Sequence, residues 1–204
     1  MITIIDYGLG NLGSVKNMLA KIGEDSIISN DSNVIGDASK LILPGVGSFD
    51  SGMLAIRELN IENVLNHMAL EVKIPILGIC LGAQLMTKCS EEGTEVGLGW
   101  FDAETKKFNH QDIKGRWPLP NIGWRDVEDH KNSPLLYGCK KLPRFYFVHS
   151  YVLTPNDDSI ISMTTDYGYK FACGLQKDNL HCVQFHPEKS HSFGFSMLKN
   201  FVDL

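Results

Sequence analysis

The sequence predicts an α/β fold with a central, mostly parallel sheet flanked by helices and an added region of antiparallel strands in the C-terminal half. In the first half, short runs rich in β-branched residues alternate with longer helical patterns, which is typical of βαβ units. From residue 97 onward, strand candidates follow one another closely, and this spacing favours antiparallel hairpins.

The first half is expected to supply the parallel strands. Its strand candidates are almost continuously apolar, as expected for strands that helices cover on both faces. We predict these strands over residues 2–6, 25–29, 40–44 and 74–79. Helical patterns cover residues 11–22, a stretch between the third and fourth strands, and residues 83–88.

The second half is expected to add further strands and to close with a helix. Its strand candidates are residues 98–107, 121–127, 145–153, 159–165, 169–177 and 180–185. Residues 190–202 carry apolar side chains at a spacing that suits a terminal helix docked on the sheet. Because no internal repeat, low-complexity tract or linker is present, residues 1–204 are expected to form a single domain.

The composition argues against several classes of function. With 43% hydrophobic and 21% charged residues, the chain has the composition of a globular protein. A net charge of −5 without a long Lys/Arg run argues against a nucleic-acid or anionic-membrane surface. The N-terminus does not resemble a signal peptide, and no apolar segment is long enough to cross a bilayer. The five cysteines include no C-x-x-C pair, so we expect a reduced, cytoplasmic protein without structural zinc.

The strongest chemical signal is a cysteine at the end of the fourth predicted strand. Residues 78–82 read G-I-C-L-G before a helical pattern, which matches the strand-turn-helix context of a nucleophile elbow with Cys80 in place of serine. Gly78 and Gly82 leave room for a sharp turn in which larger side chains would collide with the backbone. The start of a helix also favours the thiolate, which is the reactive form. The other cysteines, Cys89, Cys139, Cys173 and Cys182, lack this frame and are interpreted as small buried apolar residues.

A nucleophilic cysteine needs a base, and His186 is the strongest candidate. It follows an apolar strand, at the position where parallel-sheet enzymes place their chemistry. In an extended backbone, residues two apart point to the same side, so Glu188 is expected to reach the His186 ring and orient it. His149 also ends an apolar strand but lacks such a carboxylate, so it ranks second as a base and is favoured as a neighbour of the substrate. The remaining histidines, His67, His110, His130, His181 and His191, are interpreted as surface or satisfied core side chains.

Acyl transfer also needs hydrogen-bond donors for the oxyanion. Residues 43–48, L-P-G-V-G-S, form a glycine-rich turn after a strand and can aim backbone N–H groups at a neighbouring strand end. The amide of Leu81, next after the nucleophile, is the other expected donor. A plain strand-to-helix turn remains the alternative for residues 43–48.

A second glycine motif follows the first predicted strand. Gly8, Gly10 and Gly13 spell G-x-G-x-x-G, and Asp31 lies further along, as in a dinucleotide-binding fingerprint. The second half does not repeat βαβ units as a full dinucleotide fold would, so we expect no cofactor.

Three stretches together resemble the triad-type (class I) glutamine amidotransferases. They are the elbow at residues 78–84, the P-G-V-G loop at residues 44–47 and the H-P-E-K-S run at residues 186–190. The resemblance spans essentially the whole chain and implies the three-layer fold of that family.

Three further stretches narrow the resemblance to the glutaminase subunit of imidazole glycerol phosphate synthase. They are D-Y-G-L-G-N at residues 6–11, G-W at residues 123–124 and F-V-H-S-Y at residues 147–151. This resemblance implies that glutamine is hydrolysed and that ammonia passes to a separate (β/α)₈ barrel cyclase or synthase subunit in histidine biosynthesis. A heterodimer is therefore expected.

Carried over residue by residue, the resemblance implies a Cys-His-Glu triad. Cys80 would attack the glutamine carboxamide, His186 would act as acid and base, and Glu188 would orient His186. Contacts to glutamine or to the oxyanion are implied for Val46, Gly47, Leu81, Gln84, His149, Ser150 and Tyr151. A partner-facing side is implied for Asn11, Trp124 and Lys189, although Trp124 also fits a core position and Lys189 a solvated charge. Neither a metal nor a cofactor is implied.

The chain departs from the family pattern in one stretch. Where the family usually reads P-H-x-G-W-N, residues 120–125 read P-N-I-G-W-R. Arg125 adds a charge beside the implied docking surface, and such a change can alter partner choice. Paralogues of this family supply ammonia to other acceptors, including sugars of bacterial surface polysaccharides, so that function stays open. A different cysteine hydrolase, such as a peptidase, and a non-catalytic binding protein are the remaining alternatives.

Overall fold

The computed structural model describes residues 1–109, 117–139 and 142–204. The strands are β1 (Ile2–Ile5), β2 (Ser26–Ser29), β3 (Lys40–Gly45), β4 (Ile76–Cys80), β5 (Ala103–Lys107), β6 (Asn121–Asp126), β7 (Glu128–Asp129), β8 (Arg144–His149), β9 (Tyr151–Pro155), β10 (Ile161–Asp166), β11 (Lys170–Lys177) and β12 (Leu180–Val183). The α-helices are α1 (Leu12–Lys21), α2 (Ser32–Gly36), α3 (Phe49–Glu58), α4 (Glu62–Asn66), α5 (Leu81–Leu85) and α6 (His191–Val202). A π-helical segment, His67–Val72, extends α4, and a 3₁₀ turn, Pro187–Lys189, precedes α6.

A ten-stranded sheet runs through the molecule in the order β2-β1-β3-β4-β12-β11-β10-β7. The strands from β2 to β12 pair in parallel, and β11, β10 and β7 continue the sheet with antiparallel pairing. β9 pairs with both β11 and β5, while β6 and β8 form a separate two-stranded sheet. The predicted fold class, helices around a mostly parallel sheet with antiparallel strands added in the C-terminal half, is therefore confirmed.

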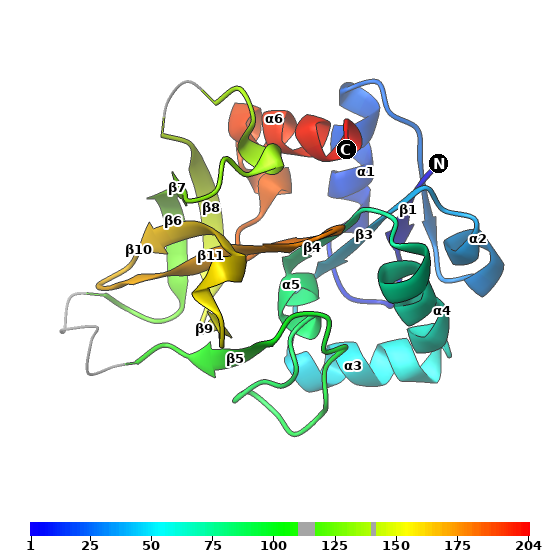
Figure 1. The fold of residues 1–204 in the computed structure, drawn as a ribbon, viewed down its shortest axis with the longest axis horizontal. Helices are drawn as coiled ribbons and strands as arrows, with labels where there is room; N and C mark the ends of the chain where they lie inside the picture. The colour runs from blue at the N-terminus through cyan, green and yellow to red at the C-terminus, as the bar shows by residue number, and fades with distance from the viewer. Residues whose placement is uncertain (110–116, 140–141) are drawn as a thin grey trace.

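Helices cover both faces of the parallel strands, with α1 and α6 on one face and α3 and α5 on the other (Figure 1). Alternate strand residues point to opposite faces, so Ile4 and Ile42 pack in the cluster that contains α1 and α6. Ile5 and Leu43 pack in the cluster that contains α3 and α5. Burial on both faces explains why these strands read as continuous apolar runs. None of the helices in the described ranges is long and apolar enough to span a bilayer.

Two of the expected strands and one helix differ from the sequence-based boundaries. The run over residues 145–153 breaks at Ser150, because β8 pairs with β6 whereas β9 pairs with β5 and β11. The polar pair His149-Ser150 marks this break in the sequence, but it does not show that the two halves pair with different strands. Of residues 98–107, only Ala103–Lys107 form a strand, and the helix expected at 83–88 runs over Leu81–Leu85.

The prediction that all four remaining cysteines are buried is wrong for two of them. Cys173 and Cys182 are fully buried, but Cys89 is exposed and Cys139 is half-buried. Cys89 forms an isolated β-bridge with Val96, and its neighbour Ser90 points inward instead. Because consecutive residues in extended backbone face opposite sides, burial of Ser90 turns the Cys89 thiol to solvent.

Of the histidines interpreted as surface or satisfied core side chains, His110 lies outside the described residues. His181 is buried, but one of its ring nitrogens lacks a hydrogen bond. His181 lies on β12 with a 4% exposed side chain, and its Nδ1 has no hydrogen-bond partner. Burial lowers the pKa of His181 from 6.5 to about 4. Between pH 6.5 and about 4, His181 binds a proton in the unfolded chain but stays neutral in the folded protein. The unfolding free energy that is present above pH 6.5 is therefore partly lost as the pH falls toward 4.

Replacing His181 with leucine should therefore flatten the acid sensitivity of the fold. Between pH 7 and about pH 4.5, the wild type should lose about 2 kcal/mol more unfolding free energy than the variant. Guanidinium unfolding at both pH values measures the difference. His67, which is exposed, replaced with glutamine is the control for loss of a histidine that is not buried. Identical pH dependence in His181→Leu and the wild type would contradict the assignment.

Candidate active site

Cys80 occupies a strained turn between β4 and α5. Its backbone dihedrals are φ 54° and ψ −108°, in a region that residues with a Cβ rarely adopt. A Cβ on Gly78 would lie 2.4 Å from the Met86 sulfur, and a Cβ on Gly82 would lie 1.7 Å from the Leu43 carbonyl oxygen. The prediction that these two glycines make room for a sharp turn is confirmed.

His186 approaches Cys80 from the end of the neighbouring strand β12. The backbone N–H of His186 donates to the carbonyl of Tyr146 at 2.8 Å, which ties the end of β12 to the β6–β8 sheet. The His186 side chain is 1% exposed. Cys80 and His186 line the same cavity of about 350 Å³, so the structure brings together two residues that are far apart in the sequence.

Glu188 reaches His186 by a route that differs from the expected one. His186 Nδ1 lies 2.7 Å from Glu188 Oε1, so the pairing inferred from the sequence is present. The extended backbone assumed for this pairing is wrong, because Pro187–Lys189 form a 3₁₀ turn. Proline fits the first position of such a turn, since its φ is fixed and its missing N–H is not needed there. The hydroxyl of Ser190 donates to the His186 carbonyl at 2.6 Å and closes the turn.

The electrostatics of the site favour a protonated His186. Burial alone would lower the pKa of His186, but its interactions with the nearby Cys80 and with Glu188 raise it to about 10. The proton on Nδ1 is donated to Glu188, whereas the buried Nε2 has no hydrogen-bond partner among the described residues and is free to exchange a proton at the site. Because α5 is only five residues long, its dipole adds little, and the imidazolium is the main positive charge beside the sulfur.

The cavity collects the substrate-side residues that the sequence singled out. Besides Cys80 and His186, it is lined by Val46, Gly47, Leu81, Gln84, His149, Ser150 and Tyr151. They come from the loop after β3, the start of α5 and the turn between β8 and β9. These segments lie far apart in the sequence, and the parallel pairing of β3, β4 and β12 brings the first two next to His186.

His149, the second candidate for the base, has both ring nitrogens occupied. Its Nδ1 lies 2.7 Å from the Tyr151 carbonyl oxygen, and its Nε2 lies 2.9 Å from Asn121 Nδ2. Burial lowers the pKa of His149 to about 4. A ring that is neutral and engaged on both sides is poorly placed to accept a proton, which favours His186 as the base.

Three residues at the site were not predicted from the sequence: Val148 and Glu92, which line the cavity, and Gln184. Glu92 lines the cavity, and its Oε2 accepts the backbone N–H of Phe49 at 2.8 Å. Gln184 is fully buried, with its Nε2 3.8 Å from the Cys80 sulfur and its Oε1 accepting from Gln84 Nε2 at 3.1 Å. A glutamine inside an apolar strand is a signal that could have identified Gln184, whereas nothing in the loop sequence singles out Glu92.

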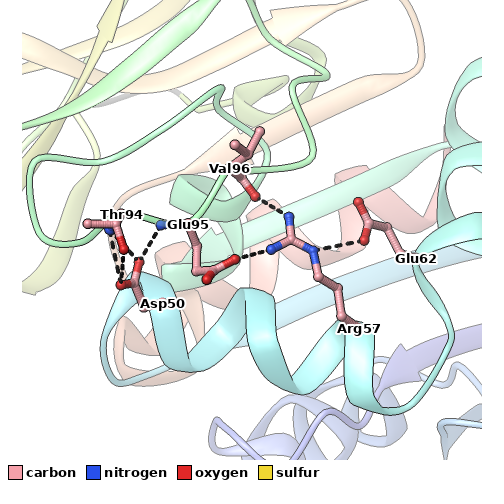
Figure 2. Close-up of polar contacts among 6 residues, drawn as sticks. All are labelled: Asp50, Arg57, Glu62, Thr94, Glu95 and Val96. Atoms are coloured by element: carbon pink, nitrogen blue, oxygen red, sulfur yellow. Dashed lines mark hydrogen bonds and ion pairs between the residues drawn. The ribbon is translucent and has the colours of Figure 1, made fainter.

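The loop that carries Glu92 is anchored on α3 (Figure 2). Asp50 accepts the backbone N–H groups of Thr94 and Glu95, each at 3.0 Å, and these bonds hold the pKa of Asp50 below its usual value. Arg57 pairs with Glu95 and donates to the Val96 carbonyl at 2.6 Å. The loop is therefore tied at two points along α3, and this fixes Glu92 at the edge of the cavity.

One glycine of the motif after β1 packs against the end of β3. Gly10 has a φ of 130°, and a Cβ there would lie 3.4 Å from the Gly45 Cα. The buried hydroxyl of Tyr7 donates to the Pro44 carbonyl at 2.6 Å. Asp31, the expected ribose ligand of a dinucleotide site, caps α2 by accepting the Asn33 N–H at 2.8 Å.

Two of the three residues assigned to a partner-facing side contact a common ring, and the third caps a helix. Trp124 stacks on His191 with ring centroids 5.5 Å apart, and Lys189 Nζ lies 5.8 Å from the centroid of the Tyr146 ring. Trp124 also contacts the edge of Tyr146 at 6.1 Å, so Trp124 and Lys189 share one patch. The side chain of Asn11 caps α1 instead, accepting the N–H of Ser14 at 3.3 Å.

In residues 1–109, 117–139 and 142–204, no group of three or more His, Cys, Asp or Glu side chains is placed to hold a metal ion.

Comparison with known proteins gives one consistent family. Residues 3–204 match the family model described as "Glutamine amidotransferase class-I". The chain is 50% identical to "Imidazole glycerol phosphate synthase subunit HisH 2" of Methanococcus maripaludis, over 99% of this chain and 98% of that protein. It is 44% identical to the subunit of the same name from Pseudomonas aeruginosa and 42% identical to subunit HisH of Leptospira interrogans, in each case over 100% of both chains.

Solved structures agree on the fold. A "glutamine amidotransferase" crystal structure superimposes with a TM-score of 0.77 at 17% identity, over 100% of this chain and 98% of that one. PurLQS from Thermotoga maritima superimposes with a TM-score of 0.75 at 18% identity, over 99% of this chain and 97% of that one. Full-length sequence identity and shared fold together lead to one conclusion: this chain belongs to the class I glutamine amidotransferase family, among the HisH subunits of imidazole glycerol phosphate synthase.

Proposed function

We propose that this protein hydrolyses glutamine to glutamate and ammonia through Cys80, His186 and Glu188. The ammonia passes to a (β/α)₈ barrel cyclase subunit, which uses it to form imidazole glycerol phosphate in histidine biosynthesis. The observation that carries this proposal is the convergence of the Cys80 sulfur and the buried His186–Glu188 pair on one cavity, in a chain 50% identical to a HisH subunit.

The first half-reaction forms a thioester. The Cys80 sulfur attacks the carboxamide carbon of glutamine, and the carbon–nitrogen bond of the tetrahedral intermediate then breaks. His186 gives its proton to the departing nitrogen, which leaves as ammonia, while a γ-glutamyl group stays on the sulfur. Glu188 holds Nδ1 of the ring, so the proton transferred is the one on Nε2.

The second half-reaction hydrolyses the thioester. The neutral His186 takes a proton from a water molecule, whose oxygen attacks the thioester carbonyl. The carbon–sulfur bond breaks, the sulfur regains its negative charge, and glutamate leaves. Both half-reactions pass through an oxyanion, for which the backbone N–H groups of Leu81 and of Val46 or Gly47 are the donors at hand.

We assign the α-ammonium end of glutamine to the part of the cavity that Glu92 lines. Among the described residues that line it, Glu92 is the only carboxylate, so we assign it to the α-ammonium group. Gln84, His149, Ser150 and Tyr151 form the remaining wall. A cavity of about 350 Å³ is at the lower end of the range for small-molecule sites, which suits a single amino acid.

A partner is required by the chemistry of the product. Ammonia released into water at neutral pH is largely protonated, and ammonium is not a nucleophile, so a docked synthase must receive it directly. We assign Trp124, Lys189 and Asn11 to the docking side. We also place the protein in the cytoplasm, in agreement with five free cysteines.

The test is glutamate release with and without the cyclase. With glutamine alone, turnover should be slow, and the cyclase carrying its acceptor substrate should raise it by about 10- to 100-fold. Glutamate is measured by a coupled dehydrogenase assay, and a peptide substrate serves as the control for a general cysteine hydrolase. Equal glutamate release with and without every candidate synthase would count against the proposal, as would cleavage of peptides.

A paralogous glutaminase is the second candidate function. Methanococcus maripaludis has two related subunits, and this chain is 50% identical to HisH 2 but 42% identical to HisH 1. The match to a second-copy subunit, together with the changed residues 121 and 125, favours testing synthases that amidate surface-polysaccharide sugars alongside the histidine-pathway cyclase. The synthase that stimulates glutamate release identifies the acceptor.

A further inference from the structure

The two positions at which the chain departs from the family pattern P-H-x-G-W-N contact each other. Arg125 Nε donates to Asn121 Oδ1 at 3.1 Å, and Asn121 is fully buried. The other guanidinium nitrogens donate to the carbonyls of Trp124 at 3.0 Å and Ile122 at 3.4 Å. The guanidinium expected beside the docking surface is therefore half-buried and hydrogen-bonded to residues of its own strand, β6.

Aromatic rings hold the Arg125 guanidinium in place. Its Cζ lies 4.6 Å from the centroid of Tyr167 and 6.0 Å from that of Trp117. The hydroxyl of Tyr167 donates to the Pro118 carbonyl at 2.6 Å, which fixes the ring beneath the guanidinium. Cation–π contact and three hydrogen bonds leave the side chain little freedom to turn away from Asn121.

The guanidinium of Arg125 fixes which atom donates in the hydrogen bonds between Asn121, His149 and Tyr151. Because arginine can only donate, the Asn121 oxygen must face Arg125 and the Asn121 amide nitrogen must face His149. The amide nitrogen donates to Nε2 of His149, so that nitrogen carries no proton. The ring proton is consequently on Nδ1, which donates to the Tyr151 carbonyl at 2.7 Å.

The surroundings of His149 agree with a neutral ring. The side chain is 6% exposed and packs against the rings of Phe108, Phe147 and Phe171. Burial is the main cause that lowers its pKa to about 4; the bond to Tyr151 acts in the opposite direction, and the charges of His186 and Arg125 add to the lowering.

We propose that Arg125 and Asn121 are positioning residues that set the tautomer of His149, and that His149 thereby holds the Tyr151 carbonyl and the adjoining wall of the glutamine cavity. The chain of bonds links the β6–β8 sheet to the first residue of β9, where the cavity wall begins. A neutral His149 also leaves the imidazolium of His186 without a second positive ring beside it. This inference rests on the proposed glutaminase function.

The ring nitrogens of His149 provide a direct test that needs no catalysis. In protein with isotope-labelled histidine, the His149 signals, identified by their loss in His149→Gln, should show a protonated Nδ1 and an unprotonated Nε2. Asn121→Asp keeps the shape but presents an oxygen to Nε2, so it should bring a proton onto that nitrogen. Nε2 protonated in the wild type, or unprotonated in Asn121→Asp, would overturn the proposal.

Arginine variants test the consequence for the cavity. Arg125→Met removes the donor that orients Asn121, and KM for glutamine should rise about tenfold, with a smaller change in kcat. Arg125→Lys keeps a donor and should recover most of the loss. Arg144→Met is the matched control, because it removes one positive charge from the same two-stranded sheet, where Arg144 pairs with Asp126 at 3.0 Å on the surface.

The outcomes separate positioning from a structural role. Equal KM values for Arg125→Met and Arg144→Met would contradict the proposal. So would a lowered melting temperature in Arg125→Met with His149 ring signals like those of the wild type. If the wild type with its partner hydrolysed no glutamine, the proposed function would fail, while the ring-nitrogen measurement would still decide whether Arg125 and Asn121 set the tautomer.

Discussion

Replacing Cys80 with alanine is expected to lower glutamine hydrolysis by at least about 10⁴-fold, because the variant has no atom that can form the thioester. The remaining donors and the His186–Glu188 pair would still bind glutamine but could only assist direct attack by water. Cys80 is buried at the edge of the core, but its sulfur makes only long contacts with Gln184 and the Val148 carbonyl, at 3.8 Å and 4.0 Å, so removing one sulfur atom should cost the fold little. Glutamate release in the presence of the cyclase measures the effect.

Ammonia-dependent product formation is the control for this variant. A complex of Cys80→Ala with the cyclase should still form product when ammonium is supplied at alkaline pH, because the cyclase site is untouched. A near-wild-type melting temperature should accompany the loss. Glutamate release at even about a tenth of the wild-type rate would exclude Cys80 as the nucleophile.

The fold was predictable where both faces of a strand are buried. Ile4 and Ile5 point to opposite cores, so the apolar run that they belong to could be recognised as a covered strand. The pairing partners of the second half were not predictable in the same way. Tyr146 and Leu153 belong to one predicted strand but to different sheets, and the polar pair at residues 149–150 does not indicate which strands each half pairs with.

The site was predictable where a residue type and a local backbone constraint coincide. Cys80 between two glycines and His186 before a proline and a glutamate are local patterns with steric and electrostatic reasons. Glu92 was not predictable, because its place depends on Asp50 and Arg57 anchoring a loop from another part of the chain. The link between Asn121 and Arg125 was hidden for a similar reason, since the sequence shows two substitutions but not that they meet.

A single methyl group at Gly82 is expected to damage the fold more than any other small change in the elbow. The Cβ of Gly82→Ala would lie 1.7 Å from the Leu43 carbonyl oxygen and 2.7 Å from its carbon, both backbone atoms of β3. Relief requires β3 and α5 to separate at the point where Gly45 pairs with Cys80, so the loss should be about 3 kcal/mol or more. Soluble yield and guanidinium unfolding measure it, and glutaminase activity should fall with the folded fraction.

Gly13→Ala supplies the matched control because the same methyl group meets no heavy atom within 4 Å there. Gly13 lies in α1, where alanine is the better helix former, so this variant should gain up to about 1 kcal/mol. The same added methyl group should therefore lower the unfolding free energy at Gly82 and raise it at Gly13. If Gly82→Ala unfolded at the same denaturant concentration as Gly13→Ala, the close approach of β3 to the elbow would be wrong. The sulfur would then lack the rigid turn that directs it toward His186.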